Sequence, residues 1–126
     1  MSVEQELLAV NQRLLESIVS QDWDVYVQLC DESLTCFEAE SRGQLAAGLP
    51  FHEYYFKLPG SKNKQVSMTG THVRVMGDAA VLSYVRLTQF LDAAGAPQTS
   101  RVEETRVWQL KDGRWKHVHF HRSTTS

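Results

Sequence analysis

The hydrophobic period of this chain changes once, near Val66, and that change limits the folds available to it. Before this point, apolar residues recur at the spacing of amphipathic helices. After it, segments 66–76, 79–91, 100–110 and 114–122 are typical of strands, and turn-forming residues separate them. Helices followed by strands predict an α+β fold in which the helices cover one face of an antiparallel sheet.

Helix signals mark the first half of the chain. Ser2 and Gln5 form a capping-box pattern that predicts a long helix from residue 3 to about residue 20. Asp22 can cap a second, shorter helix. We expect a short strand at 34–38 and a turn at 41–43. Pro50, at a favoured first-turn position, then predicts a short helix with the sequence FHEYYF, and a loop at 58–64 follows it.

Composition limits the possible functions. The chain has 126 residues, a length that fits one domain spanning 1–126. Its net charge of -2 argues against nucleic-acid binding, which needs a basic field. No segment approaches the roughly 20 apolar residues of a membrane span, and the first ten residues lack signal-peptide features, so we expect a cytoplasmic protein. Cys30 and Cys36 lie inside apolar elements, and we expect core thiols rather than a disulfide.

Arginines occupy the apolar faces of three consecutive predicted strands, at Arg86, Arg106 and Arg122. Alternate residues of a strand share a face, so Arg86 accompanies Leu82 and Tyr84. Arginine stays charged at any useful pH. A fold that turns several arginines inward must therefore supply partners for them, and an anion is the natural partner.

The turn at Asp112-Gly113 decides whether the arginines share one face. A two-residue loop would place Arg106 opposite His119. A three-residue loop at 111–113, with Gly113 left-handed in a bulge, would place Arg106 opposite Val118. We favour the second register, because it gives a coherent apolar face and brings all three arginines together.

Two interpretations of the arginines are open. Each one could pair with a neighbouring carboxylate or extend to the rim of the sheet. Glu104, however, is the only acid on these three strands that shares their face, and one carboxylate cannot neutralise three cations. Since an unpaired buried ion costs on the order of several kcal/mol, we favour a pocket for an anion, and carboxylates suit the guanidinium fork.

These segments also carry a family resemblance. CFEAE, GLPFHEYYF, YVRLTQFLDAAGAPQT, EETRVWQLKDGRW and VHFHRS are similar to the association (hub) domain of calcium/calmodulin-dependent protein kinase II. That family lies within the nuclear transport factor 2-like and SnoaL-like superfamily. The resemblance implies a cone-shaped α+β fold, with a long N-terminal helix packed in a strongly curved antiparallel sheet. It also implies a homo-oligomer, a closed ring of twelve or fourteen subunits.

The resemblance implies a ligand pocket as well. Arg86, Arg106 and Arg122 would line this pocket, His52 would lie near its entrance, and Tyr26 falls where the hub carries a tyrosine. Small carboxylates are the implied ligands, and no cofactor is implied. Because the sequence shows no kinase domain and no calmodulin-binding segment, we expect a free-standing hub-like domain.

A small SnoaL-like enzyme is the alternative function. Such an isomerase, hydratase or hydrolase would act on an anionic substrate, with His52 as its acid–base group. Glu53 lies beside His52, but adjacent helix residues point about 100° apart and do not readily share a substrate. His117, His119 and His121 alternate on the last strand, and we expect exposure or a subunit contact there rather than a metal site.

Overall fold

The computed structural model describes residues 1–60 and 63–124, so residues 61–62 of the predicted loop lie outside the described residues. Within the described residues, the helices are α1 (Val3–Val19), α2 (Trp23–Leu29) and α3 (Pro50–Phe56). The strands are β1 (Cys30–Phe37), β2 (Ala46–Ala47), β3 (Gln65–Met76), β4 (Ala79–Leu91), β5 (Pro97–Lys111) and β6 (Arg114–Thr124), and a 3₁₀ turn, η1 (Ala39–Ser41), follows β1. All three predicted helix starts are confirmed, with Ser2 in a capping box, Asp22 as the cap of α2 and Pro50 in the first turn of α3.

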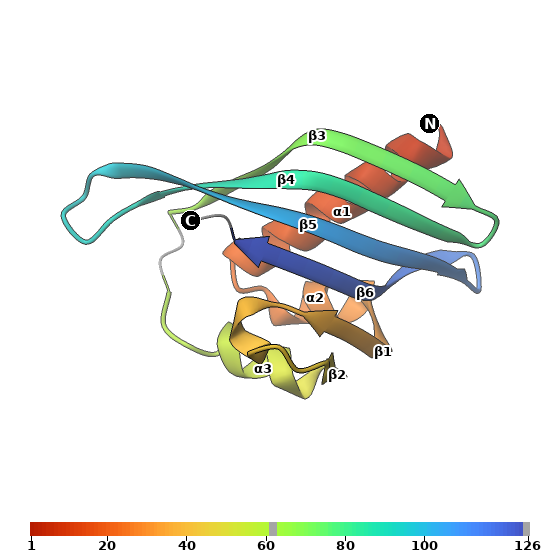
Figure 1. The fold of residues 1–126 in the computed structure, drawn as a ribbon, viewed down its shortest axis with the longest axis horizontal. Coiled ribbons are helices and arrows are strands. Elements are labelled where there is room, and N and C mark those ends of the chain that lie inside the picture. The colour runs from red at the N-terminus through yellow and green to blue at the C-terminus, as the bar shows by residue number, and fades with distance from the viewer. Residues whose placement is uncertain (61–62, 125–126) are drawn as a thin grey trace.

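The strands form one sheet in the order β2-β1-β6-β5-β4-β3 (Figure 1). The neighbours are antiparallel except for β1 and β6, which run parallel. The chain leaves β1, passes through α3 and the β3–β5 meander, and returns as β6 beside β1. This arrangement confirms the α+β fold with a long helix against a curved sheet, and its parallel pair brings the end of β1 next to the end of β6.

Helix α1 crosses the face of the sheet and supplies much of the core (Figure 1). Its leucines Leu7, Leu14 and Leu15 are fully buried in one cluster with Trp108 of β5. Burial of each leucine is worth about 1.5–3 kcal/mol. Asn11, also on the buried side of α1, accepts a hydrogen bond from the indole Nε1 of Trp108 at 3.0 Å. These contacts fix the helix over the strands that carry the arginines.

Near its turn, the β5–β6 hairpin has the register of the two-residue alternative and not that of the favoured three-residue loop. Lys111 pairs with Arg114, so the loop has two residues, and Asp112 and Gly113 both have positive φ angles, of 51° and 77°. An Asp-Gly pair suits such a type I′ turn. Further along β6, the register shifts by one residue at Val118, between the pairs Trp108↔His117 and Val107↔His119.

This bulge in β6 changes the pairing beyond it. Arg106 pairs with Phe120 rather than with His119 or Val118, and Glu104 pairs with Arg122. A bulged residue moves the side chains beyond it to the opposite face, so the arginines still come together although the predicted turn was wrong. His117, which we expected to be exposed, instead lies opposite Trp108 and is completely buried.

The expected core thiols are confirmed, since Cys30 and Cys36 are buried and free. Burial raises the pKa of each thiol to about 12, which keeps both protonated at neutral pH. Among the described residues, no helix is both long enough and apolar enough to cross a membrane.

Candidate functional site

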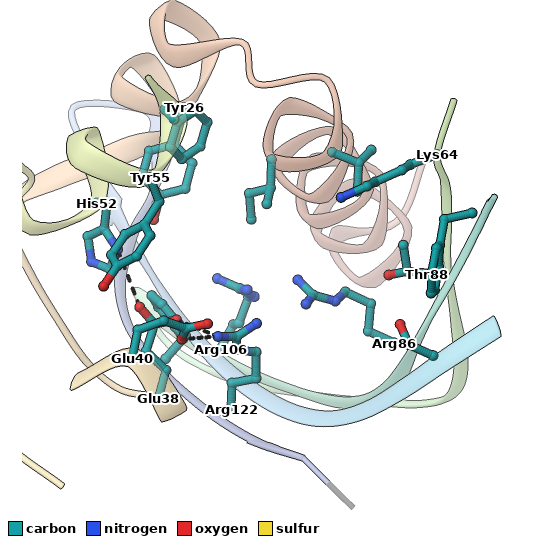
Figure 2. Close-up of a pocket in the computed structure, with 16 residues that line it drawn as sticks. Tyr26, Glu38, Glu40, His52, Tyr55, Lys64, Arg86, Thr88, Arg106 and Arg122 are labelled. Atoms are coloured by element: carbon teal, nitrogen blue, oxygen red, sulfur yellow. Dashed lines mark hydrogen bonds and ion pairs between the residues drawn. The ribbon is translucent and has the colours of Figure 1, made fainter. Parts of the chain in front are cut away.

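A cavity of about 480 Å³ lies between the helices and the inner face of the sheet. All five predicted site residues lie on its wall (Figure 2). Tyr26 comes from α2 and His52 from α3, while β4, β5 and β6 contribute Arg86, Arg106 and Arg122. The structure therefore brings together residues that are up to 96 positions apart in the sequence. Their role in binding stays a prediction.

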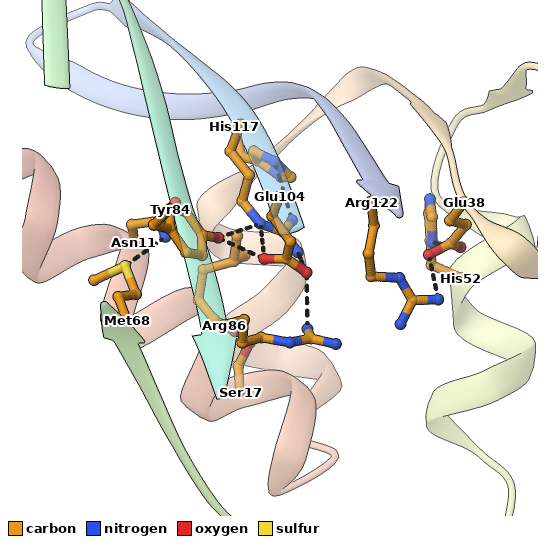
Figure 3. Close-up of polar contacts among 12 residues, drawn as sticks. Asn11, Ser17, Glu38, His52, Met68, Tyr84, Arg86, Glu104, His117 and Arg122 are labelled. Atoms are coloured by element: carbon orange, nitrogen blue, oxygen red, sulfur yellow. Dashed lines mark hydrogen bonds and ion pairs between the residues drawn. The ribbon is translucent and has the colours of Figure 1, made fainter. Parts of the chain in front are cut away.

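Arg106 is the most buried of the three arginines, with 1% of its surface exposed. Its Nε donates to Tyr84 Oη at 2.9 Å and to Glu104 Oε1 at 3.2 Å, and its Nη2 donates to Glu104 Oε2 at 3.2 Å. Figure 3 shows these two partners, Tyr84 and Glu104. The guanidinium carbon of Arg106 lies 4.3 Å from the centre of the Phe120 ring, a cation–π contact. These contacts hold the guanidinium group in one orientation at the base of the cavity.

Glu104 is the buried counter-charge for two arginines. Its carboxylate accepts from Arg106, from Arg86 Nη1 at 3.1 Å and from Tyr84 Oη at 2.6 Å. Burial alone would raise the pKa of Glu104, but Arg106 and Arg86 outweigh burial and lower it. Glu104 is therefore ionised and fully occupied by its own chain.

His117 is a buried partner of Arg106 that the strand pattern placed on the opposite face. Its Nε2 lies 3.3 Å from Arg106 Nη1, and because arginine can only donate, Nε2 must accept. Its Nδ1 then carries the proton and faces the Cys30 thiol at 3.5 Å. Burial and the neighbouring Arg106 hold the pKa of His117 well below its ordinary value, so the ring is neutral. The period-two pattern could not reveal this contact, because the bulge at Val118 reverses the pattern.

Arg122 has two carboxylates of its own, which corrects the sequence-based charge argument. Its Nη2 lies 3.2 Å from Glu38 Oε2 and also contacts Glu40 Oε2. Both acids come from the segment after β1. The charge argument counted acids only on the three strands that carry the arginines, so it did not include them. The parallel pairing of β1 and β6 explains this contact, since Phe37 pairs with His121 and so brings Glu38 next to Arg122. Glu104 is thus not the only internal partner of the arginines.

The cavity still has donors without acceptors. The Nε atoms of Arg86 and Arg122 are buried, and neither has a hydrogen-bond partner among residues 1–60 and 63–124. An unsatisfied buried donor costs about 1–3 kcal/mol. The cavity wall carries three arginines and Lys64 against Glu38 and Glu40, and Glu104, which is not part of the wall, pairs with Arg86 and Arg106, so four cations face three carboxylates.

His52 is buried, and the acid beside its ring is Glu38. Glu53, its neighbour in the sequence, pairs instead with Lys57. The Nδ1 atom of His52 lies 3.7 Å from Glu38 Oε1, and its Nε2 lies 3.7 Å from Cys36 Sγ. Burial, reinforced by Arg106, lowers the pKa of His52 to about 4. Burial also raises the pKa of Glu38. His52 is therefore a neutral ring at physiological pH that can donate to or accept from a ligand.

Cys36, Glu38 and His52 also place three potential metal-ligand atoms within 4.8 Å of one another. Their surroundings disfavour a cation, because Arg122 already pairs with Glu38 and burial keeps the Cys36 thiol protonated. His119 and His121 lie apart from this group, against Phe37.

Comparisons with known proteins show what this chain resembles. The family described as "Calcium/calmodulin dependent protein kinase II association domain" matches residues 3–126. The rabbit (Oryctolagus cuniculus) calcium/calmodulin-dependent protein kinase type II subunit delta is 45% identical over 123 residues, which are 94% of this chain and 23% of that protein.

Solved structures give the same result. The hub homology domain from Chlamydomonas reinhardtii has a TM-score of 0.94 and 47% identity, and the match covers 99% of this chain and 100% of that one. A nuclear transport factor 2-like protein from Salmonella enterica has a TM-score of 0.80 at 22% identity, covering 98% of this chain and 92% of that one. At this identity, the second likeness shows the fold alone.

Proposed function

This chain belongs to the calcium/calmodulin dependent protein kinase II association domain family, whose members form homo-oligomeric hubs, and we propose that it forms a closed ring whose subunits each bind a small carboxylate. The proposed ring has twelve or fourteen subunits. The chain spans 23% of the length of the kinase that it matches, so the proposal concerns the association domain and not the activity of a kinase. The cytoplasmic location expected from the sequence stays a prediction.

One observation carries the ligand proposal: three guanidinium groups converge on one cavity (Figure 2), and two of them keep a buried Nε–H without an acceptor. Guanidinium groups bind planar anions through paired hydrogen bonds. A carboxylate in this cavity would lie among the guanidinium groups of Arg86, Arg106 and Arg122 and would offset the positive charge that Lys64 adds to the wall. The internal acids leave one positive charge in place, because Lys64 and the three arginines face only Glu38, Glu40 and Glu104.

The shape and lining of the cavity favour a small ligand with a short apolar part. A volume of about 480 Å³ falls within the range of small-molecule sites. Beside the charged groups, the wall carries Ile18 and Val19 at the end of α1, together with Phe56 and Phe90. A short aliphatic carboxylate can place its charged end at the arginines and its chain against these residues. Tyr26 and His52 border the charged end.

Thermal unfolding tests the ligand proposal. Sodium butyrate should raise the melting temperature of the wild-type chain, and sodium chloride at equal ionic strength should not. A ligand at about 100 times its Kd stabilises the native state by roughly 2.7 kcal/mol. Butyramide, which has the same size without the charge, is the second control. The proposal fails if neither butyrate, acetate, phosphate nor sulfate shifts the transition beyond chloride.

Arg86→Gln is the informative variant. It removes one cation from the wall but leaves Glu104 paired with Arg106 and Tyr84, so the core network is preserved. Arg74→Gln on the exposed surface of β3 is its matched control. We expect Arg86→Gln to lose most of the butyrate-dependent shift and Arg74→Gln to keep it.

The enzymatic alternative has one supporting observation, the approach of Glu38 to His52. A neutral histidine next to a carboxylate can act as a base. The 3.7 Å separation exceeds an ordinary hydrogen bond, however, and Glu38 also pairs with Arg122. A turnover that His52→Ala abolishes would favour the SnoaL-like enzyme over the binding hub.

A further inference from the structure

The three carboxylates around the arginines, Glu38, Glu40 and Glu104, differ in burial and in their number of contacts. The side chain of Glu104 has no exposed surface and contacts Arg86, Arg106 and Tyr84. The side chain of Glu38 is 10% exposed and lies between Arg122 and His52. The side chain of Glu40 is 38% exposed, and it hydrogen-bonds to Arg122 Nη2. Glu40 is therefore the acid that can return to water at the lowest cost.

The backbone around Glu40 allows its side chain to move while the turn stays in place. Glu40 is the middle residue of η1, a single 3₁₀ turn at the surface. The turn is fastened on either side of Glu40, because Ser41 Oγ donates to the Glu38 carbonyl at 2.8 Å and accepts from the Glu38 N–H at 3.1 Å. A rotation of the Glu40 side chain breaks neither of these bonds.

A carboxylate ligand that approaches Arg122 would be repelled by the two carboxylates already paired with it. Arg122 already faces Glu38 and Glu40, and a third carboxylate at the same guanidinium group would add like-charge repulsion in a partly buried site. Departure of one acid removes this repulsion. Glu38 cannot leave easily, because it is buried against His52, whereas Glu40 is open to solvent.

We propose that Glu40 occupies the ligand's place on Arg122 and is displaced into solvent when a carboxylate binds. This inference rests on the proposed function, since it assigns how the same pocket is filled. It also defines the ligand class more narrowly. The ligand must present the planar, charged pair of oxygens that the Glu40 side chain presents, and a neutral amide cannot replace it.

Calorimetric titration of the 126-residue chain with sodium butyrate tests the displacement. Glu40→Gln removes the competing charge and should bind butyrate up to about fivefold more tightly than wild type, because binding no longer has to break a partly exposed ion pair. Glu40→Asp keeps the charge but shortens the side chain by one methylene, so it should also bind more tightly. Glu53→Gln, which breaks an ion pair with Lys57 on the outer side of α3, should bind like wild type.

The outcomes separate the displacement from the proposed function. Tighter binding by both Glu40 variants supports displacement. Tighter binding by Glu40→Gln alone, with Glu40→Asp equal to wild type, would show a general charge effect and overturn the displacement. Equal affinities in wild type and both variants also overturn it, while leaving the anion pocket intact. If wild type and all folded variants bind no butyrate, both the displacement and the proposed pocket are wrong.

Discussion

Arg106 and His117 lie side by side in the core, with Arg106 Nη1 3.3 Å from His117 Nε2 and neither side chain more than 1% exposed. This contact requires a neutral imidazole, because a protonated ring could not accept the hydrogen bond and would face a permanent cation. Protonation of His117 is therefore incompatible with the native arrangement of the arginine at the base of the cavity.

Acid should destabilise the chain through this contact. The folded-state pKa of His117 is depressed, so the unfolded chain binds more protons below the ordinary histidine pKa of about 6.5. The stability contributed by neutral His117 is fully present above that value and is lost as the pH falls below it, with a slope of about 1.4 kcal/mol per pH unit. His52, with its pKa lowered to about 4, adds to the loss over the same range.

The variant His117→Leu isolates the contribution of His117. Below pH 6.5, we expect the free energy of unfolding to fall less steeply in His117→Leu than in wild type. The difference in slope should be about 1.4 kcal/mol per pH unit, the value for one bound proton. His121→Gln, at an exposed position on the same strand, is the control. Urea unfolding between pH 4.5 and 7.5 measures the difference, and identical slopes in wild type and His117→Leu would disprove the assignment.

Loss of the buried carboxylate should be costly. Glu104→Gln leaves Arg106 and Arg86 without their shared counter-ion, and removal of one partner of a buried ion pair costs about 3–5 kcal/mol. Glu103→Gln is a matched control, because Glu103 is the preceding residue of β5 and is exposed. Chemical unfolding at one protein concentration should separate the two variants clearly. Equal stability would show that the network around Glu104 is not needed for folding.

The assembly is a separate prediction. In solution at micromolar concentration, light scattering should give a mass of twelve to fourteen times the 14.3 kDa of one chain. A closed ring needs a head-to-tail contact that repeats around the axis, so the mass should not grow with concentration. A monomer, or a species that grows steadily with concentration, would contradict the ring.

The hydrophobic period predicted most of the elements. Capping residues located α1, α2 and α3, and alternation placed Leu82, Tyr84 and Arg86 on one face of β4. These features depend on neighbours within a few positions along the chain, which is the range that such patterns report. The meeting of all three arginines was also predicted, although the predicted turn was wrong.

The partners of the arginines could not be predicted in the same way. Glu38 and Glu40 reach Arg122 because β1 pairs in parallel with β6, more than 80 residues later, and no local pattern encodes such a pairing. The two-residue turn places His117 opposite Trp108, and only the bulge at Val118 lets Phe120 and Arg122 share its face, which the alternation along β6 does not encode. Sequence analysis therefore found the cations of the site but overestimated their unpaired charge.

A crystal structure of the 126-residue chain grown with 3-bromopropionate tests the carboxylate pocket directly, because bromine gives an anomalous signal. The account predicts a bromine peak inside the cavity, with the carboxylate bound to Arg122 and to at least one of Arg86 and Arg106, and with the Glu40 side chain turned to solvent. A cavity that holds only water at saturating ligand, with Glu40 still on Arg122, would contradict the carboxylate pocket.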